Sequence, residues 1–529
     1  MRTGEALVEL LAGSYGVDTV FGIPGVHNIE LYRGLARSGV RAVSPRHEQG
    51  AGFMADGWAL ATGRPGVCAV ISGPGLTNVL TPVGQAFHDS RPMLVLAATT
   101  ATADLGRGHG PLHDVPDQAA IARPITAFSE TVLDPATVPG LVAGAWDVFD
   151  NHRPRPVHLA LPTDVLEAEA GPFTALARAA RRAEADPAAI TAAARALRGA
   201  ARPAIIAGGG SVAAGSELRR VAERIGAVVV LTGNGKGVLA SSHPLCAGNA
   251  LSNPACQAVL AAADVVVVGA GVVSDADVWN GGRPLPRAPG GTIVRIDLDA
   301  AQLERRMQPS VGIVADAAAA LAAIADALGA GEPSQWGAAQ AAEVRAAVAA
   351  AASPAMLPWL RALKQAVPAH AFVALDSTQL AYTAHSFLPC EAPRRWLAPY
   401  GFGTLGCAIP MAIGACVASP GQPAFALVGD GGWMFTVAEM ATAADLGLDI
   451  VAVMWDNGGY GQIAISFDDA AAPPIGVAIS SPDPESIARG FGWHVRTVDR
   501  PGDLQHAIAQ SFAAGGPNFV RVRVPRLPA

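Results

Sequence analysis

Short apolar segments alternate along the chain with longer segments in which apolar residues recur every three or four positions. The apolar segments lie at 17–22, 42–44, 67–71, 93–97, 157–161, 204–207, 228–231, 265–269, 293–297, 372–375, 424–428 and 450–455. Runs with little polar alternation are typical of strands buried on both faces, as in a parallel sheet covered by helices. The pattern therefore predicts an α/β protein built from doubly wound parallel sheets.

The pattern divides into three predicted α/β domains, at residues 1–171, 187–329 and 354–529. The connecting segment 172–187 is rich in alanine, arginine and proline, whereas 329–353 is rich in alanine and is expected to be partly helical and partly linker. A length of 529 residues is also that of about three domains.

Composition narrows the class of protein. The chain is 51% hydrophobic and 15% charged, and its net charge of -7 without a basic run argues against a nucleic-acid partner. No apolar segment approaches the length of a membrane span, and the N-terminus has no signal-peptide pattern. The six cysteines form no C-x-x-C pair, as expected in a reducing compartment. We therefore expect a cytoplasmic protein without a membrane partner.

Two strand ends in the third domain carry hard oxygen ligands. The strand at 424–428 runs into Gly429-Asp430-Gly431-Gly432, a helical pattern follows at about 436–446, and the strand at 450–455 ends in Asp456-Asn457. Such oxygens suit Mg²⁺, and the glycines would let the backbone approach a diphosphate. An ordinary strand–helix turn explains Gly-Asp-Gly equally well in isolation, but a second ligand 27 positions later favours a metal–phosphate site.

Glu48 stands between His47 and Gln49 at the start of an apolar helix. A glutamate there is also explained by its favourable interaction with the helix dipole. The turns at 22–25, 46–51 and 72–78 all follow predicted strands, so we expect them at one edge of the first sheet.

These turns resemble a known family. Phe21-Gly22-Ile23-Pro24-Gly25, Arg46-His47-Glu48-Gln49-Gly50-Ala51, Ser72-Gly73-Pro74-Gly75-Leu76-Thr77-Asn78 and the Asp430–Asn457 spacing are similar to thiamine-diphosphate enzymes of the acetolactate synthase and 2-oxo acid decarboxylase group, over nearly the whole chain. The pattern looks closest to 5-guanidino-2-oxopentanoate decarboxylases.

The resemblance implies thiamine diphosphate and Mg²⁺ as cofactors and decarboxylation of a 2-oxo acid through a C2 ylid and an enamine. One alternative is acetolactate-synthase-type carboligation, in which the enamine adds to a second carbonyl compound. A non-catalytic relative is a further alternative. The resemblance also implies a homodimer or homotetramer in which Glu48 of one subunit faces the diphosphate half of another.

Residue roles follow from the resemblance by position. Glu48 would hydrogen-bond the aminopyrimidine ring, the carbonyl of Gly403 would accept from its amino group, and Leu405 would support the bent cofactor or simply belong to the core. The metal ligands would be Asp430, Asn457 and the carbonyl of Gly459. The other expected cofactor contacts are Pro24, Gly25, Asn78, Ser377, Thr378, Gln379, Gly429, Gly431, Gly432 and Tyr460.

The substrate-facing residues are less well specified. His113 and His109, in the loop at 107–114, are candidate catalytic acids because histidine titrates near neutrality, although histidines in a glycine-rich loop are often simply solvated. His27, Asn28 and Gln118 are weaker candidates.

The sequence departs from its apparent relatives at three positions. Val26 and Asp456 stand where relatives carry Asp and Asn, and Gln462 stands where a carboxylate for a guanidinium substrate is expected. Asp456 or Asp468-Asp469 could compensate.

FAD is left open without being favoured. The glycine-rich turns at 208–210, 232–237 and 269–271 leave room for a nucleotide, but they are also typical of tight strand–helix turns.

Overall fold

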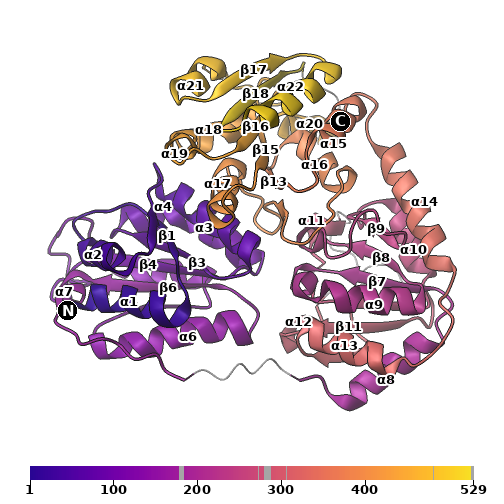
Figure 1. The fold of residues 1–529 in the computed structure, drawn as a ribbon, viewed down its shortest axis with the longest axis horizontal. Coiled ribbons are helices and arrows are strands. Elements are labelled where there is room, and N and C mark those ends of the chain that lie inside the picture. The colour runs from indigo at the N-terminus through magenta and orange to yellow at the C-terminus, as the bar shows by residue number, and fades with distance from the viewer. Residues whose placement is uncertain (178–183, 272, 279–287, 306, 481, 526–529) are drawn as a thin grey trace.

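The computed structural model describes residues 1–177, 184–271, 273–278, 288–305, 307–480 and 482–525, and it contains three parallel six-stranded sheets flanked by helices (Figure 1). The α/β fold predicted from the sequence is thereby confirmed. Part of the expected linker at 172–187 lies outside the described residues.

The first sheet has the strand order β2-β1-β3-β4-β6-β5. Its strands are β1 (Thr19–Gly22), β2 (Arg41–Val43), β3 (Gly66–Val70), β4 (Met93–Thr99), β5 (Phe128–Thr131) and β6 (Pro156–Pro162). Its helices are α1 (Thr3–Tyr15), α2 (Ile29–Ser38), α3 (Glu48–Thr62), α4 (Pro74–His88), α5 (Gln118–Ala122), α6 (Val138–Asn151) and α7 (Thr163–Glu167).

The middle sheet has the order β12-β11-β10-β7-β8-β9. Its strands are β7 (Pro203–Ala207), β8 (Val228–Leu231), β9 (Cys246–Gly248), β10 (Val265–Gly269), β11 (Thr292–Asp297) and β12 (Val311–Val314). The helices of this region are α8 (Pro187–Arg198), α9 (Gly215–Ile225), α10 (Pro254–Ala262), α11 (Asp275–Val278), α12 (Ala300–Leu303), α13 (Ala317–Ala327) and α14 (Trp336–Ala351).

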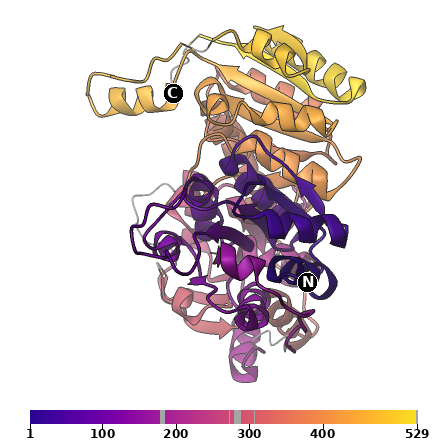
Figure 2. The same ribbon diagram turned by 90° about the vertical axis from the view of Figure 1, so that its left-hand side faces the viewer.

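The third sheet has the order β14-β13-β15-β16-β18-β17, which repeats the connectivity of the first sheet strand for strand. Its strands are β13 (Phe372–Leu375), β14 (Trp396–Leu397), β15 (Ala424–Gly429), β16 (Ile450–Asp456), β17 (His494–Val498) and β18 (Asn518–Arg523). Its helices are α15 (Leu357–Ala366), α16 (Gln379–Phe387), α17 (Ala408–Ala418), α18 (Asp430–Phe435), α19 (Glu439–Asp445), α20 (Gly461–Asp469), α21 (Pro484–Gly490) and α22 (Pro501–Ala514). The segment around α20 projects from this domain (Figure 2).

The helix expected at about 436–446 is present as the shorter α19, which begins at Glu439. A separate helix before it, α18, begins at Asp430 itself and was not predicted. Gly431 and Gly432 are poor helix formers, but a Cβ at Gly431 would lie 2.6 Å from the Tyr460 ring and one at Gly432 would lie 2.7 Å from Asp376. At Gly431 and Gly432 the neighbouring segments therefore lie too close for a residue larger than glycine.

The first and third domains share one core. Helices α3 and α17 cross so closely that a side chain at Gly57 would overlap the Met411 main chain, and one at Gly414 would overlap that of Met54. Interlocked main chains of this kind resist sliding, because packed interiors deform little.

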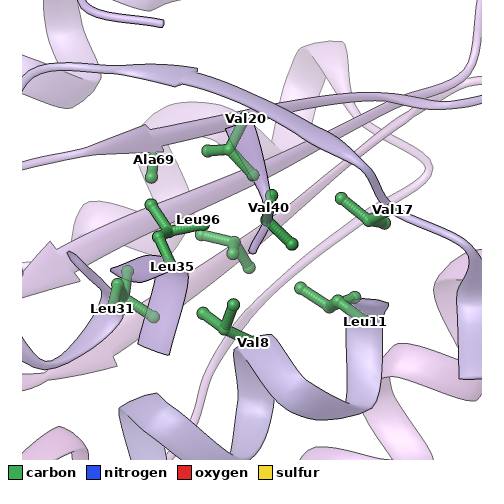
Figure 3. Close-up of a pocket in the computed structure, with 9 residues that line it drawn as sticks. All are labelled: Val8, Leu11, Val17, Val20, Leu31, Leu35, Val40, Ala69 and Leu96. Atoms are coloured by element: carbon green, nitrogen blue, oxygen red, sulfur yellow. The ribbon is translucent and has the colours of Figure 1, made fainter. Parts of the chain in front are cut away.

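The opposite face of the first sheet packs against α1 and α2 around a small apolar cavity (Figure 3). Nine aliphatic residues line it: Val8, Leu11, Val17, Val20, Leu31, Leu35, Val40, Ala69 and Leu96. Because no polar side chain lines this cavity, it belongs to the core rather than to a site. In the described part of the chain, no helix has both the length and the apolar character needed to cross a membrane.

Candidate active site

The start of α3 presents Glu48 at the carboxyl end of the first sheet. His47 is the extended residue before the helix, and its Nδ1 accepts a hydrogen bond from the Gln49 N–H at 3.1 Å. The Glu48 side chain is buried, with 8% of the residue exposed, and its Oε2 accepts a hydrogen bond from the Asn78 amide at 3.0 Å. Glu48 and Asn78 lie 30 positions apart in the sequence, and both were expected to contact the cofactor. In the fold they are in direct contact.

The turn after β1 lies at the same edge, because β1 is the neighbour of both β2 and β3. Asn28 Oδ1 accepts from the Gly25 N–H at 2.8 Å, and its amide donates to the Ile23 carbonyl at 3.1 Å. Asn28 is fully buried, so this weaker substrate candidate holds the Ile23-Pro24-Gly25 turn in shape instead.

The second predicted cluster lies at the carboxyl end of the third sheet. Asp430 begins α18 directly after β15, and only 1% of the residue is exposed. Burial raises the pKa of Asp430 to about 6, and the nearby Asp456 carboxylate adds to the rise. Its Oδ2 is buried with no hydrogen-bond partner among the described residues. A buried carboxylate oxygen without a partner is costly unless a ligand, such as a cation, completes its contacts.

Asn457 lies at the end of the neighbouring strand β16, where its amide donates to Gln379 Oε1 at 3.1 Å. This hydrogen bond uses the amide nitrogen of Asn457, so the side-chain oxygen of Asn457 takes no part in it. Gly459 follows with φ of 141°, a backbone conformation that favours glycine, and the Tyr460 N–H donates to the Val477 carbonyl at 2.9 Å. The structure thus collects residues from the ends of β15 and β16 and from the start of α16.

These groups fit Mg²⁺ and a diphosphate. Among the described residues no three His, Cys, Asp or Glu side chains cluster as metal ligands, so a metal here would also need amide and carbonyl oxygens. That donor set suits Mg²⁺ and not Zn²⁺. Gly429 lies beside Thr378, where a Cβ would be 2.7 Å from the hydroxyl, so two strand ends converge on the start of α18. Such a helix start favours an anion.

Asp376 connects the turn after β13 to the segment at 401–406. Its carboxylate accepts from the Gly406 N–H at 2.8 Å and from the Ser377 N–H at 2.9 Å, and burial raises its pKa to about 7. Gly403 is exposed with φ of 63°, and Leu405 is half-buried and does not belong to the core that the first and third domains share. A half-buried Leu405 is less readily explained as a plain core residue.

The histidine loop contacts the first-domain edge through His113. Its carbonyl accepts from the Ser72 hydroxyl at 3.0 Å, its φ is 63°, and its ring lies 5.2 Å from the His27 ring. The Nδ1 atoms of both rings are buried without described partners. Burial, followed by the charge of His113, lowers the pKa of His27. A strained residue beside a second histidine is unusual for a purely structural loop.

His109 and Gln118 differ from His113. His109 is exposed and its Nδ1 lies 2.9 Å from the Asp104 carboxylate. Gln118 is buried, and its amide oxygen and nitrogen bind the Gly73 N–H and the Ala98 carbonyl. Gln118 therefore has a structural role in the loop.

Two contacts near the site could not be predicted from the sequence. The Asp456 carboxylate binds Arg521, with Nε at 2.8 Å. Glu439, fully buried on α19, accepts hydrogen bonds from the main chain beside Glu48. Both contacts join distant segments, so spacing along the chain does not reveal them.

The glycine turns of the middle domain close on each other. A side chain at Gly208 would overlap Gly271, and one at Gly210 would lie 2.5 Å from Ala270. This packing explains these glycines without a bound nucleotide.

Three domain patterns of known proteins match the chain: the thiamine pyrophosphate enzyme N-terminal TPP-binding domain over residues 1–121, the central domain over 190–324 and the C-terminal TPP-binding domain over 376–522. The probable 2-ketoarginine decarboxylase AruI of Pseudomonas aeruginosa is 42% identical and aligns with 99% of this chain and 94% of that protein. The acetolactate synthase isozyme 1 large subunit of Escherichia coli is 29% identical over 99% and 94%. The acetolactate synthase large subunit of Corynebacterium glutamicum is 32% identical over 88% and 76%.

Proposed function

The chain belongs to the thiamine pyrophosphate enzyme family and is a thiamine-diphosphate-dependent decarboxylase or carboligase, and we propose that it releases CO₂ from a 2-oxo acid with Mg²⁺ as the metal. The observation that carries this proposal is the buried Glu48 at the start of α3, held by Asn78 at the edge where the pyrimidine half of the cofactor is expected.

Thiamine diphosphate, when bound, would supply a nucleophilic carbon for the carbonyl group of the 2-oxo acid and an electron sink for the electron pair that remains when CO₂ leaves. Glu48 would bind the aminopyrimidine ring of the cofactor through its carboxylate and would thereby favour loss of the cofactor's C2 proton. Asn78 holds the Glu48 carboxylate from the side, which limits its rotation. The buried setting strengthens this hydrogen bond.

Asp430, Asn457 and the Gly459 carbonyl hold Mg²⁺, and the start of α18 with Gly431 and Gly432 receives the diphosphate. The unpartnered Oδ2 of Asp430 supports this assignment most directly, because a cation would complete its contacts. The remaining predicted residues line the cofactor between these two ends.

The two halves are proposed to come from different subunits of a homodimer, or of a tetramer built from it. Both edges expose large apolar residues in the single chain: Val26 (69%) and Leu112 (61%) at the first, Phe435 (50%) and Ile475 (81%) at the third. Apolar side chains around two incomplete half-sites are expected where a second copy covers them.

His113 is the proposed proton donor to the product-forming carbon. Its buried, unpartnered Nδ1 and its neighbour His27 favour it over His109, which is exposed and paired with Asp104.

The proposed substrate class is a 2-oxo acid with a cationic end, as the name of the Pseudomonas relative indicates for that protein. The Asp456 carboxylate is bound by Arg521, and Asp468-Asp469 lie at the opposite end of α20 from Gln462. Asp114, next to His113, has a buried Oδ1 without a described partner, so it is the better candidate to meet a guanidinium group.

Acetolactate-synthase-type carboligation is the second candidate, supported by the similarity to two acetolactate synthases. The test is CO₂ release and product identification with 5-guanidino-2-oxopentanoate, pyruvate, 2-oxoisovalerate and benzoylformate. We expect CO₂ and an aldehyde, with 5-guanidino-2-oxopentanoate preferred and the preference reduced in Asp114→Asn. Acetolactate from pyruvate would favour the second candidate, and no CO₂ from any acid would contradict both.

A further inference from the structure

Glu439 is a fully buried carboxylate whose contacts are mainly with uncharged groups. It lies on α19 of the third domain, and its oxygens accept hydrogen bonds from the Arg46 N–H at 3.1 and 3.2 Å, the His47 N–H at 3.0 Å and the Thr442 hydroxyl at 2.7 Å. Burial raises its pKa, and the hydrogen bonds from Thr442, Arg46 and His47 oppose the rise. Burying a carboxylate is costly, so its position calls for an explanation beyond packing.

The groups that Glu439 binds lie immediately before Glu48. Residues 46 and 47 form the turn that leads into α3, and His47 is the extended residue directly before the helix begins at Glu48. Fixing both of their N–H groups fixes the main chain from which the Glu48 side chain projects. The Arg46 side chain also pairs with Asp445 at the other end of α19, so the same short helix holds this turn twice.

The first turn of α3 and the Glu439 side chain lie so close together that no side chain fits between them. A side chain at Gly50, in the first turn of α3, would overlap the Glu439 carboxylate. Farther along α3, the interlocked main chains of α3 and α17 hold the same two domains together. Glu439 therefore contacts a closely packed part of the interface between the first and third domains.

From this geometry we propose that Glu439 is a positioning residue that holds Glu48 at the height required by the aminopyrimidine ring. This inference rests on the proposed function of Glu48. Glu439 itself touches neither cofactor nor substrate; it acts through two peptide groups. Its segment follows α18, which begins with Asp430, so one stretch of chain carries a proposed metal ligand and the support of a proposed catalytic acid.

The test is the rate at which the C2 proton of bound thiamine diphosphate exchanges with deuterium, measured by NMR after acid quenching and without substrate. Glu439→Gln keeps one acceptor oxygen and Glu439→Ala keeps none. We expect exchange to fall about 10-fold in the first and about 100-fold in the second, because small misplacements of catalytic groups have effects of this size. The dissociation constant of thiamine diphosphate should stay within about threefold, because the proposed diphosphate and metal contacts are unchanged.

The matched control is Asp264→Asn. Asp264, in the middle domain, also accepts hydrogen bonds from two consecutive N–H groups, those of Ala201 and Arg202, at 2.9 and 3.0 Å. Its substitution should lower the melting temperature without changing C2 exchange. Unchanged exchange in both Glu439 variants, or an equal loss in Asp264→Asn, would overturn the proposal.

Gly50→Ala provides a second route if the Glu439 variants do not fold. The added methyl group displaces the Glu439 carboxylate while keeping its charge and improving helix propensity. We expect a comparable loss of exchange, and wild-type exchange in this variant would contradict the role of Glu439. Glu48→Gln separates the two proposals: if it leaves exchange intact the proposed function fails, whereas a loss confined to Glu48→Gln rejects only the role of Glu439.

Discussion

The first and third domains have the same strand order and the same succession of elements, yet their equivalent strand ends carry different chemistry. After β2 the first domain places Glu48, whereas after the equivalent β14 the third domain places the Gly403–Leu405 segment. After β3 comes Asn78, and after the equivalent β15 comes Asp430. One scaffold therefore presents a hydrogen-bonding carboxylate at one edge and the proposed metal ligands at the other.

The two helices that pack the first and third domains together occupy equivalent positions in the two domains. Helix α3 follows β2, α17 follows β14, and these two helices pack against each other through glycines. The strand order is the same in both domains. Their different proposed roles in cofactor binding are therefore set by a few side chains at the carboxyl ends of the strands. This is the edge where ligands bind in parallel sheets.

Removing the acid of the first domain should have the largest effect. Glu48→Gln keeps the size and the contact with Asn78 but cannot bind the ring nitrogen as a carboxylate does. We expect CO₂ release to fall about 10²- to 10⁴-fold, the range for a lost acid–base group, while thiamine diphosphate still binds. The matched control is Glu130→Gln, an exposed glutamate on β5 of the same domain, which should retain activity. Near-normal turnover in Glu48→Gln would contradict the assigned chemistry.

Removing the carboxylate of the third domain should weaken binding instead. We expect Asp430→Asn to reduce Mg²⁺ and cofactor affinity by about 100-fold or more. In the wild type, Mg²⁺ must compete with a proton for a group whose pKa is raised to about 6. The affinity should therefore fall about tenfold for each pH unit below about 6 and level off above about 7. Calorimetric titration of Mg²⁺ across pH 5–8 measures this, and an affinity independent of pH would count against Asp430 as a ligand.

The same pKa sets the sign of a stability effect in the metal-free protein. Because the folded-state pKa of Asp430 lies above its usual value, protonation favours the fold, and this contribution is lost as the pH rises from about 4 through about 6. Asp430→Asn should consequently raise the melting temperature of the metal-free protein at pH 7 and leave it nearly unchanged at pH 4. An equal effect at both pH values would show that the buried charge is not the cause.

The histidine loop should give a smaller effect on catalysis. His113→Asn should slow product formation about 10- to 100-fold with little change in cofactor affinity, because water can partly replace a lost proton donor. His109→Asn is the matched control from the same loop and should change turnover less than about twofold. A larger loss from His109→Asn than from His113→Asn would reverse the assignment.

Most of the central strands were predictable from sequence because they are continuous apolar runs, as at 424–428 and 450–455, although the inner strand β18 was not predicted. Among the edge strands, β2 was predicted at 42–44, but β5, β14 and β17 were not: β14 has only two residues, and β5 and β17 mix buried and exposed positions. The start of α18 was missed because its glycines suggest a turn, and only the neighbouring Tyr460 and Asp376 explain why glycine is required there.

The candidate site likewise has parts that the sequence indicated and parts that it did not. Its local parts, such as Gly-Asp-Gly and the turn around Glu48, could be predicted because the residues are consecutive. The contacts of Glu439 with the 46–47 turn, of His27 with His113 and of Asp456 with Arg521 join segments that meet only in the fold. Sequence therefore indicated the proposed reacting groups more fully than the residues that contact them.

The Glu48 edge of one chain and the Asp430 edge of another are proposed to form one active site. Mixing inactive Glu48→Gln chains with inactive Asp430→Asn chains tests this proposal directly, because each mixed dimer would contain one site with both residues intact. With random reassociation, half of the dimers are mixed and half of their sites are intact, so about a quarter of the wild-type activity should return. If activity stays at the level of the two parent variants although mixed dimers are isolated, the two edges do not cooperate between chains.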